Sequence, residues 1–538
     1  MKIKLFLLLL VSCLVLPAKT WAQQDYRNFN TLTRDLSALA SRHSANTDLK
    51  SLAKTPGNKD IWALTLYSGQ AQDKPAVAIV GGVDGSHVLG VEMTARLAEK
   101  ILTDHKDLLE KTTFYIFPNM SPDATEQYFN ALKYERRGNG ANTDDDRDGD
   151  FGEDGFEDLN KDKRITMMRI EDPTGDYRML EEDPRIMVKA NPAKGEVGTH
   201  KLLTEGMDND KDGHFNEDGE GGVIFNKNLS YNFPYFKPGA GEHPVSQKES
   251  RALLDFLYAQ PNIYSILTFG PANNLTKPMK YNASGANKRV VTSILKGDAK
   301  LNELLSETYN KIVSPKNAPA SVTEGGGFFE WSYFHFGKLA MSTPGWWAPM
   351  PAKDTTQKET KNAALNFLRW AEQNDVNDVF VDWKEVKHPD FPNQKVEVGG
   401  MVPFKQMNPP YTMVEEAVNK HSEFLAAFLK MQAAVKFENL KTESLGDGMN
   451  RITVDLHNPG LLPTHTEMGD RSRWMRQINV DLKLANNQKI VSGRGHQLIN
   501  VIPQDGTVQL TWLVQGKGSV ELTAGAPHVG TETIRIKL

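Results

Sequence analysis

An apolar run followed by two glycines and a helical pattern, residues 75–102, constrains the fold of this chain most. Residues 76–80 (AVAIV) are all apolar, which is typical of a buried strand. After Gly81-Gly82, apolar residues recur near helical spacing, at Val88, Val91, Ala95, Leu97, Ala98 and Leu102. Asp84 and His87 lie three residues apart on the turn, where two side chains can converge on one point. Because open α/β sheets bind ligands beyond the carboxyl ends of their strands, we expect an α/β fold with a functional site at this turn.

The composition is that of a large globular protein. The 538 residues are 39% hydrophobic and 24% charged, which suffices for two or three domains with a sizeable core. The formal net charge of −5 gives no reason to expect a nucleic-acid partner. The only cysteine, Cys13, falls in the leader described next, so the mature chain has neither disulfides nor thiolate metal ligands.

The first 22 residues have the pattern of a secretory signal peptide. Lysines near the start precede an apolar region at residues 5–16, and Thr20-Trp21-Ala22 gives a small-x-small cleavage pattern. We therefore expect cleavage after Ala22 and a periplasmic or secreted protein without a later membrane span. A membrane anchor is disfavoured because the apolar run is shorter than the ~20 residues needed to span a bilayer. Residues 10–13 (LVSC) weakly resemble a lipoprotein signal, but the leader before them would be very short, so lipid anchoring is the less favoured alternative.

Further strand-and-turn motifs follow along the chain. Phe114–Phe117 ends in the turn PNMSPDA, and the apolar segment 263–269 ends in GPANN. Residues 329–333 (FEWSY) precede another strand-like segment at 338–347 (KLAMSTPGWW). Together with the Gly-Gly turn, these motifs resemble the zinc carboxypeptidases of the carboxypeptidase A type over roughly residues 60–430. The resemblance implies an α/β/α fold with a mixed, largely parallel central sheet.

At the zinc site of that family, the resemblance places different residues in this chain. The family has His-x-x-Glu after the turn, and here these positions carry Asp84 and His87. The third ligand, a histidine, is replaced by Thr268 or Phe269 depending on the register, and the general-base glutamate is replaced by Gly345. A catalytic zinc needs about three protein ligands, and a glutamate takes the proton of its bound water. We therefore expect no zinc and no hydrolysis of the family type, although two ligands could still hold a metal loosely.

The substrate-binding motif of the family has a counterpart in residues 221–228 (GGVIFNKN). Asn226 matches the family's asparagine, and Lys227 stands where an arginine grips the terminal carboxylate of the substrate. Lysine keeps the charge but loses the planar two-point fork, so the grip should be weaker. A second register would put Tyr231 at the arginine position. Arg137 is the candidate for the arginine that polarises the scissile carbonyl, with a solvated basic pair as the alternative.

An acidic repeat occupies the segment at about 142–220. Its two copies share their spacing, with carboxylates at Asp144, Asp146, Asp148, Glu153 and Asp154 and at Asp208, Asp210, Asp212, Glu217 and Asp218. A weaker third loop carries Asp158, Asn160 and Asp162. Alternating carboxylates on a tight loop with glycine at the turn are how a protein gathers oxygen ligands for calcium. We expect structural calcium in at least one loop, against the alternative of an acidic solvated surface.

The last hundred residues alternate between apolar and polar positions with a period of two. Segments of this kind occur around residues 452–456, 478–484, 508–514 and 534–536, and Gly, Asn and Pro separate them. This pattern predicts a C-terminal β-sandwich. The expected organisation is a signal peptide at 1–22, a carboxypeptidase-like α/β domain at 23–430 in which residues 375–430 connect, and the sandwich at 431–538.

Two functional classes follow from these observations. The first is a catalytically inactive carboxypeptidase-like protein that binds a peptide, a cell-envelope component or another carboxylate-bearing ligand through Asn226, Lys227 and Arg137. The second is an active metallocarboxypeptidase or amidohydrolase with a rebuilt metal site, using Asp84, His87 and a histidine such as His335. The substitutions favour the first class, and the zinc content of the purified protein separates the two.

Overall fold

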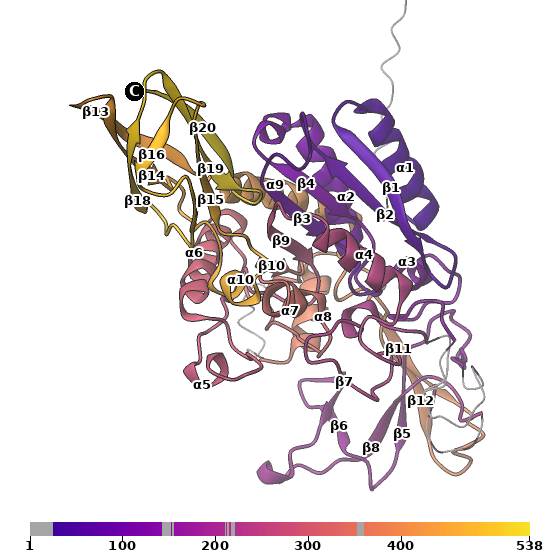
Figure 1. Ribbon diagram of the computed structural model, residues 1–538. Coiled ribbons are helices and arrows are strands. Elements are labelled where there is room, and N and C mark those ends of the chain that lie inside the picture. Colours follow the sequence, from indigo (N-terminus) through magenta and orange to yellow (C-terminus); the bar gives the residue numbers. More distant parts are fainter. Residues whose placement is uncertain are drawn as a thin grey trace, which may run out of the picture.

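A six-stranded mixed sheet forms the centre of the molecule (Figure 1). The computed structural model describes residues 25–142, 152, 155–209, 211, 213, 215–216, 221–351 and 360–538, so the predicted leader lies outside the described residues. The strand order is β1-β2-β4-β3-β9-β10, with bounds Thr47–Lys54, Asp60–Leu66, Thr113–Phe117, Ala76–Val80, Ile263–Phe269 and Leu339–Thr343. Strands β4, β3, β9 and β10 run parallel, whereas β1 and β2 join antiparallel. The predicted mixed and largely parallel sheet is therefore confirmed.

Helices cover both faces of this sheet. One face packs against α1, α2, α6 and α9, with bounds Phe29–Arg42, Val88–Thr103, Lys296–Val313 and Val414–Leu429. The other face packs against α4 and α7, with bounds Lys248–Tyr258 and Phe328–Phe334. The short helices α3 and α5 span Pro122–Thr125 and Ala283–Ala286. Within the described part of the chain, no helix combines the length and the apolar character needed to cross a membrane.

The predicted strand-turn-helix is present as β3 and α2, and all five residues of β3 are buried. The strand β1, which directly precedes β2, was not predicted. It lies at the edge of the sheet, its sequence TDLKSLAK is largely exposed, and it carries two lysines. Charged edge strands resist further strand pairing, and for the same reason they lack the apolar pattern from which buried strands are recognised.

A second six-stranded sheet lies below the central one in Figure 1. Its order is β11-β12-β5-β8-β6-β7, with bounds Phe380–Val386, Val396–Met401, Met167–Glu171, His200–Thr204, Tyr177–Leu180 and Asp183–Lys189. Helix α8, Ala363–Gln373, packs with β7 in one small core, and Met168, Ile170, Val396 and Val398 form another. The acidic segment and the connecting segment, treated separately in the sequence, thus build one sheet.

The C-terminal residues form two four-stranded sheets that enclose a common core, as the alternation predicted. The first has the order β13-β14-β18-β16, with bounds Lys436–Gly446, Met449–His457, Thr507–Gln515 and Lys489–Ser492. The second has the order β17-β15-β19-β20, with bounds His496–Ile499, Ile478–Lys483, Ser519–Ala526 and Gly530–Lys537. Helix α10, Glu467–Ser472, joins this part to the α/β part, because the carboxylate of Asp298 accepts hydrogen bonds from the Glu467 and Met468 amides at 2.8 and 3.0 Å.

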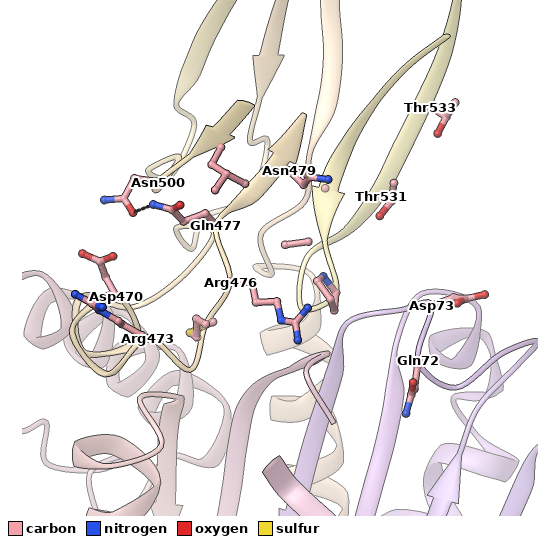
Figure 2. Close-up of a pocket in the computed structure, with 15 residues that line it drawn as sticks. Gln72, Asp73, Asp470, Arg473, Arg476, Gln477, Asn479, Asn500, Thr531 and Thr533 are labelled. Carbon is pink, nitrogen blue, oxygen red and sulfur yellow. Dashed lines mark hydrogen bonds between the residues drawn. The ribbon is translucent and has the colours of Figure 1, made fainter. Parts of the chain in front are cut away.

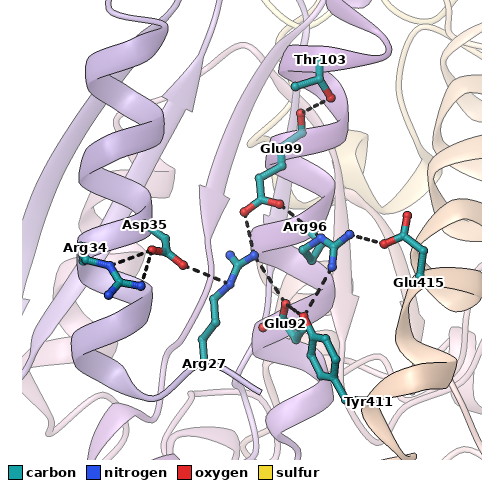
Figure 3. A network of polar contacts seen from close by, with 9 residues as sticks. All are labelled: Arg27, Arg34, Asp35, Glu92, Arg96, Glu99, Thr103, Tyr411 and Glu415. Atoms are coloured by element: carbon teal, nitrogen blue, oxygen red, sulfur yellow. Dashed lines mark hydrogen bonds and ion pairs between the residues drawn. The ribbon is translucent and has the colours of Figure 1, made fainter. Parts of the chain in front are cut away.

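A partly buried ionic network fixes α2 between its neighbours (Figure 3). The Arg27 guanidinium, before α1, lies 2.7 Å from Glu99 and 3.5 Å from Glu92, both on α2. The Tyr411 hydroxyl donates to Glu92 at 2.9 Å, and Arg96 pairs with Glu415 of α9. Burial raises the pKa of the Glu92 carboxyl, and Arg27 and Tyr411 oppose that shift. The network therefore holds the helix that carries the candidate site against α1 and α9.

Candidate functional site

The turn between β3 and α2 packs directly on the turn that follows β4. A side chain at Gly81 would lie 2.3 Å from the Gly90 carbonyl oxygen, and one at Gly82 would lie 2.4 Å from Asn119 Oδ1. Gly82 also has a φ of +59°, which L side chains rarely adopt. Glycine is therefore required at both positions, and the turn places Asp84 beyond the carboxyl end of the parallel strands.

Asp84, which the motif resemblance aligns with the family's first metal ligand, has protein partners on both carboxylate oxygens. Its Oδ1 accepts hydrogen bonds from the Ser86 amide at 3.1 Å and the Ser86 hydroxyl at 2.8 Å. Its Oδ2 accepts from Arg137 Nε at 3.0 Å, with Nη2 at 2.8 Å. Burial alone would raise the pKa of Asp84, but the Arg137 charge and the Ser86 hydrogen bonds outweigh burial and lower it. The carboxylate is thus held ionised by an arginine.

Arg137 extends this pair into a chain of four charges, which we call the charge cluster: Asp84, Arg137, Glu324 and Lys227. Arg137 Nη1 and Nη2 donate to the two carboxylate oxygens of Glu324 at 3.3 and 3.0 Å. Lys227 Nζ lies 3.7 Å from Glu324 Oε2. Burial lowers the pKa of Arg137, but the two carboxylates reverse that effect and raise it overall. Two cations therefore converge on one carboxylate.

The charge cluster can be reached from solvent. The side chains of Arg137, Glu324 and Lys227 are 30%, 34% and 21% exposed, whereas that of Asp84 is 9% exposed. The cluster thus has a buried end at the strand-turn-helix and an accessible end at Glu324.

His87, which the motif resemblance aligns with the family's second metal ligand, bonds to a different segment of the chain. Its Nε2 lies 3.0 Å from the carbonyl oxygen of Pro344, so this nitrogen acts as the donor. Burial lowers the pKa of His87, partly offset by the charge of Asp84 and by the carbonyls of Pro344 and Phe269. The ring therefore joins the start of α2 to the loop after β10 as a neutral group.

The remaining two positions carry no metal ligand or base. Thr268 and Phe269 are buried at the end of β9, and the Phe269 ring packs edge-on against His421. Gly345 has a φ of +78°, and its amide donates to the Thr343 hydroxyl at 3.1 Å. Among the described residues, no three His, Cys, Asp or Glu side chains are grouped so that they could hold a metal ion. The side chains at these positions do not fit a catalytic zinc.

The other predicted contacts divide between the charge cluster and the core. Asn226 Oδ1, in the 3₁₀ turn Phe225–Lys227, accepts from the Phe328 amide at 2.9 Å and so fixes the start of α7. Tyr231, the residue of the second register, is buried, and its hydroxyl donates to the Val291 carbonyl at 2.9 Å. Of the two alignments of the substrate-binding motif, only the one that uses Lys227 places a charged side chain near Arg137, with Glu324 contacting both. His335 Nδ1 lies 2.9 Å from the Ser230 hydroxyl, and its ring contacts Tyr231 edge-on.

The acidic loops are described only in part. Asp144, Asp146, Asp148, Glu153, Asp154, Asp210, Asp212, Glu217 and Asp218 lie outside the described residues. In the third loop, Asp158 Oδ1 and Asn160 Oδ1 accept from the Asp162 amide at 3.0 and 2.9 Å. Asp158 Oδ2 accepts from the Lys163 amide at 2.7 Å, and Asp162 Oδ1 accepts from the Arg164 amide at 2.8 Å. The side chains of this loop therefore accept hydrogen bonds from the loop's own backbone amides.

Glu324 is the site residue that the sequence analysis missed. It directly precedes Gly325-Gly326-Gly327. Gly326 has a φ of +78°, and a side chain there would lie 2.1 Å from the Lys227 carbonyl oxygen. The glycines thus let this loop lie flat on the Lys227 turn. A lone carboxylate before three glycines is the signal that could have drawn attention to it, because such glycines permit close backbone approach.

Relatives of the chain are recognisable over parts of its length. Residues 434–537 match a domain of unknown function (DUF8731). Carboxypeptidase D of Homo sapiens is 24% identical over 111 residues, which are 19% of this chain and 8% of that protein. A metallocarboxypeptidase A-like protein of Trichophyton verrucosum is 32% identical over 109 residues, 19% of this chain and 25% of that protein. This chain thus spans a small part of the length of these relatives.

Similarity to solved structures covers more of the chain, but the sequence identity is lower. The crystal structure of thrombin activatable fibrinolysis inhibitor aligns over 76% of this chain and 74% of its own, with 11% identity and a TM-score of 0.41. The sequence model of the zinc carboxypeptidases matches residues 32–344, more than half of the chain. The protein is therefore a member of the zinc carboxypeptidase family.

Proposed function

We propose that this protein is an exported, catalytically inactive member of its family that binds a peptide or another carboxylate-bearing ligand at the charge cluster. The observation that carries this proposal is the convergence of Arg137 and Lys227 on the carboxylate of Glu324, at 3.0 and 3.7 Å. Two cations that meet at one accessible carboxylate form a receptor for a carboxylate from another molecule.

The positive charge of Arg137 beside Asp84 argues against hydrolysis by a bound zinc ion. The Arg137 guanidinium lies 2.8 Å from the carboxylate at the first ligand position, where it would repel a divalent cation. Activation of water at a zinc site requires an open coordination position and a base that removes the proton. With Gly345 at the base position, no side chain is present there to take that proton.

The charge cluster already holds the carboxylate of Glu324, which favours a terminal or side-chain carboxylate as its ligand. Arg137 offers its planar fork and Lys227 a single point charge, which suits the two oxygens of one carboxylate. Glu324 occupies this position in the free protein, so an incoming ligand must displace it. The Glu324 side chain is 34% exposed, so it can turn into solvent when a ligand displaces it.

Calorimetric titration with paired peptides tests this proposal. An acetylated dipeptide with a free carboxyl terminus should bind, and the same dipeptide with a carboxamide should bind at least tenfold more weakly, about 1.4 kcal/mol. Lys227→Met should weaken binding of the free-carboxyl peptide, while Lys189→Met, which removes an exposed and remote ion pair, should not. One zinc per chain that is lost on His87→Ala, together with peptide hydrolysis, would instead establish the rebuilt enzyme.

The leader and the domain organisation belong to the same proposal. Residues 1–22 carry the export pattern, and mature protein recovered from the cell envelope should begin at Gln23. The α/β domain at 23–430 and the sandwich at 431–538 are the proposed units.

We also propose that the acidic repeats bind structural calcium. Two loops with the same carboxylate spacing in one segment support this assignment, since closely spaced carboxylates need a counter-ion. Calcium should raise the thermal midpoint of the full chain, and a chelator should reverse the increase. Asp146→Asn combined with Asp210→Asn should abolish the calcium response, while magnesium at equal concentration should leave the midpoint unchanged.

A further inference from the structure

We propose that a groove between the C-terminal sandwich and the α/β part of the chain binds an oligosaccharide. This second site shares no residue with the charge cluster, so its test is independent of the function proposed above. The groove has a volume of about 1300 Å³ (Figure 2).

The floor of the groove is one row of residues across the second sheet of the sandwich. Asn479 on β15 pairs with Leu498 on β17 and with Gly525 on β19, and Gly525 pairs with Thr531 on β20. All four residues line the groove. Gly525 leaves the middle of this row without a side chain. The row therefore forms a trough bordered by Asn479 and Thr531.

The two walls come from different parts of the chain. Arg473 and Arg476 lie in the segment between α10 and β15, and Gln72 and Asp73 lie in the loop between β2 and β3 (Figure 2). Figure 2 shows the Arg476 side chain between Arg473 on one side and Gln72 and Asp73 on the other. Arg473 ends helix α10 in the left-handed conformation that is common at helix C-termini, with a φ of +61°.

The lining offers donors and acceptors without an excess of charge. Asn479 Oδ1 is buried and accepts no hydrogen bond within the described residues. The opposite charges of Arg476 and Asp73 face the same space, and Thr531 and Thr533 add hydroxyls. A sugar hydroxyl both donates and accepts, so it can satisfy amide, hydroxyl, guanidinium and carboxylate groups in turn.

Other ligand classes fit this lining less well. Nucleic acid requires a net positive surface for its phosphates, and here Arg473 and Arg476 are balanced by Asp470 and Asp73. A peptide added as a strand extends a sheet at its edge, whereas the groove lies over the face of the sheet between its edge strands β17 and β20. The volume exceeds the roughly 300–1,000 Å³ of small-molecule pockets, which favours a chain of several sugars over a single one.

Titration of the full chain with soluble hexasaccharides tests this inference. The probes are cellohexaose, xylohexaose, maltohexaose and the hexamer of N-acetylglucosamine, each in calorimetry against the wild-type protein. We expect at least one probe to bind with Kd below roughly 1 mM. Thr531→Trp fills the trough and should weaken that binding at least tenfold, and Asn479→Ala should weaken it by a smaller factor.

The matched control is Thr511→Trp, which places the same side chain at an exposed position of β18, in the other sheet of the sandwich. This variant should bind the saccharide within twofold of wild type, and circular dichroism should show both tryptophan variants folded. Absence of binding for all four probes, or binding that Thr531→Trp leaves unchanged, overturns the inference. So does a (Gly-Ser)₅ peptide that binds where the saccharides do not and is blocked by Thr531→Trp, since this result would assign the groove to peptides.

Discussion

Arg137 donates to Asp84 from Nε at 3.0 Å, and this pair places a positive charge beside the residue that the motif resemblance aligns with the family's first metal ligand. The guanidinium reaches the same carboxylate from a segment more than fifty positions later, with Nη2 at 2.8 Å from Oδ2. Because Asp84 is buried, its charge depends on that partner. The pair is therefore as much a part of the folded core as of the candidate site.

Arg137→Met should destabilise the protein by about 3 kcal/mol, because it leaves the buried carboxylate of Asp84 without a cation. Urea unfolding at pH 7 measures the loss. The double variant Asp84→Asn/Arg137→Met should recover part of it, since no unpaired charge then remains. The control Arg251→Met removes an exposed pair with Asp255 and should cost less than about 0.5 kcal/mol. Equal losses for the two arginine variants would contradict the structural role.

Glu324→Gln should increase the affinity for a free-carboxyl dipeptide about fivefold, or about 1 kcal/mol. The neutral amide no longer competes with the ligand for Arg137 and Lys227. Calorimetry on wild type and variant measures the change. Glu443→Gln, which removes an exposed pair with Arg451, is the matched control and should leave the affinity unchanged. A decrease in affinity would show that Glu324 contacts the ligand favourably.

Gly345→Glu should leave peptide hydrolysis absent, although it restores the residue type of the family at the base position. Among the residues that the structure describes, no three His, Cys, Asp or Glu side chains could hold a metal ion for the new carboxylate to assist. The variant should lose about 1–2 kcal/mol of stability, because φ at this position is +78°. Gly345→Ala should lose a similar amount, since a side chain there meets Phe269 and Met93 at ordinary contact distances. Measurable hydrolysis by the glutamate variant would show that a metal site exists.

Lys338 should make stability depend on pH in the alkaline range. Its side chain is buried at the start of β10, with Nζ 3.2 Å from the Trp474 carbonyl oxygen, and burial lowers its pKa to about 7. Between pH 7 and the unfolded value near 10.4, the unfolded chain binds the extra proton, so stability rises with pH by about 1.4 kcal/mol per unit. Below pH 7 both states are protonated and this contribution is constant.

Chemical unfolding of wild type and Lys338→Met from pH 6.5 to 9.5 measures that slope. As the pH rises above 7, the unfolding free energy of the wild type should increase relative to that of Lys338→Met. Lys420→Met, which removes an exposed ammonium paired with Glu416, should show a constant difference from wild type. A constant difference for Lys338→Met as well would place its pKa at the ordinary value.

The buried parts of the fold were predictable because their signals are local. The run at residues 76–80 and the period-two pattern of the C-terminal strands each carry apolar side chains that have only one way to be buried. The second sheet was not predictable in this way. Strands β6 and β8 are four and five residues long and mostly half-exposed, and β5 pairs with β12 from a remote segment.

The charge cluster was predictable only as separate residues. Asp84, Arg137 and Lys227 could be singled out by their place in family motifs, but which of them meet depends on three loops from different parts of the chain. Glu324 has no motif and acquires its importance only from its position between two cations. Asn226 shows the reverse case, since a matching motif residue is used here to fix the start of a helix.

Strand β5 pairs with β12 at Met168 and Val398, although most of the α/β part separates the two in sequence. During synthesis, β5 therefore keeps one edge unpaired until residues beyond Met401 have left the ribosome. Unpaired strand edges are templates for aggregation, and contacts between distant segments slow folding. A fragment cut before Phe380 would retain that uncovered edge permanently, whereas the complete chain closes it with its own later strand.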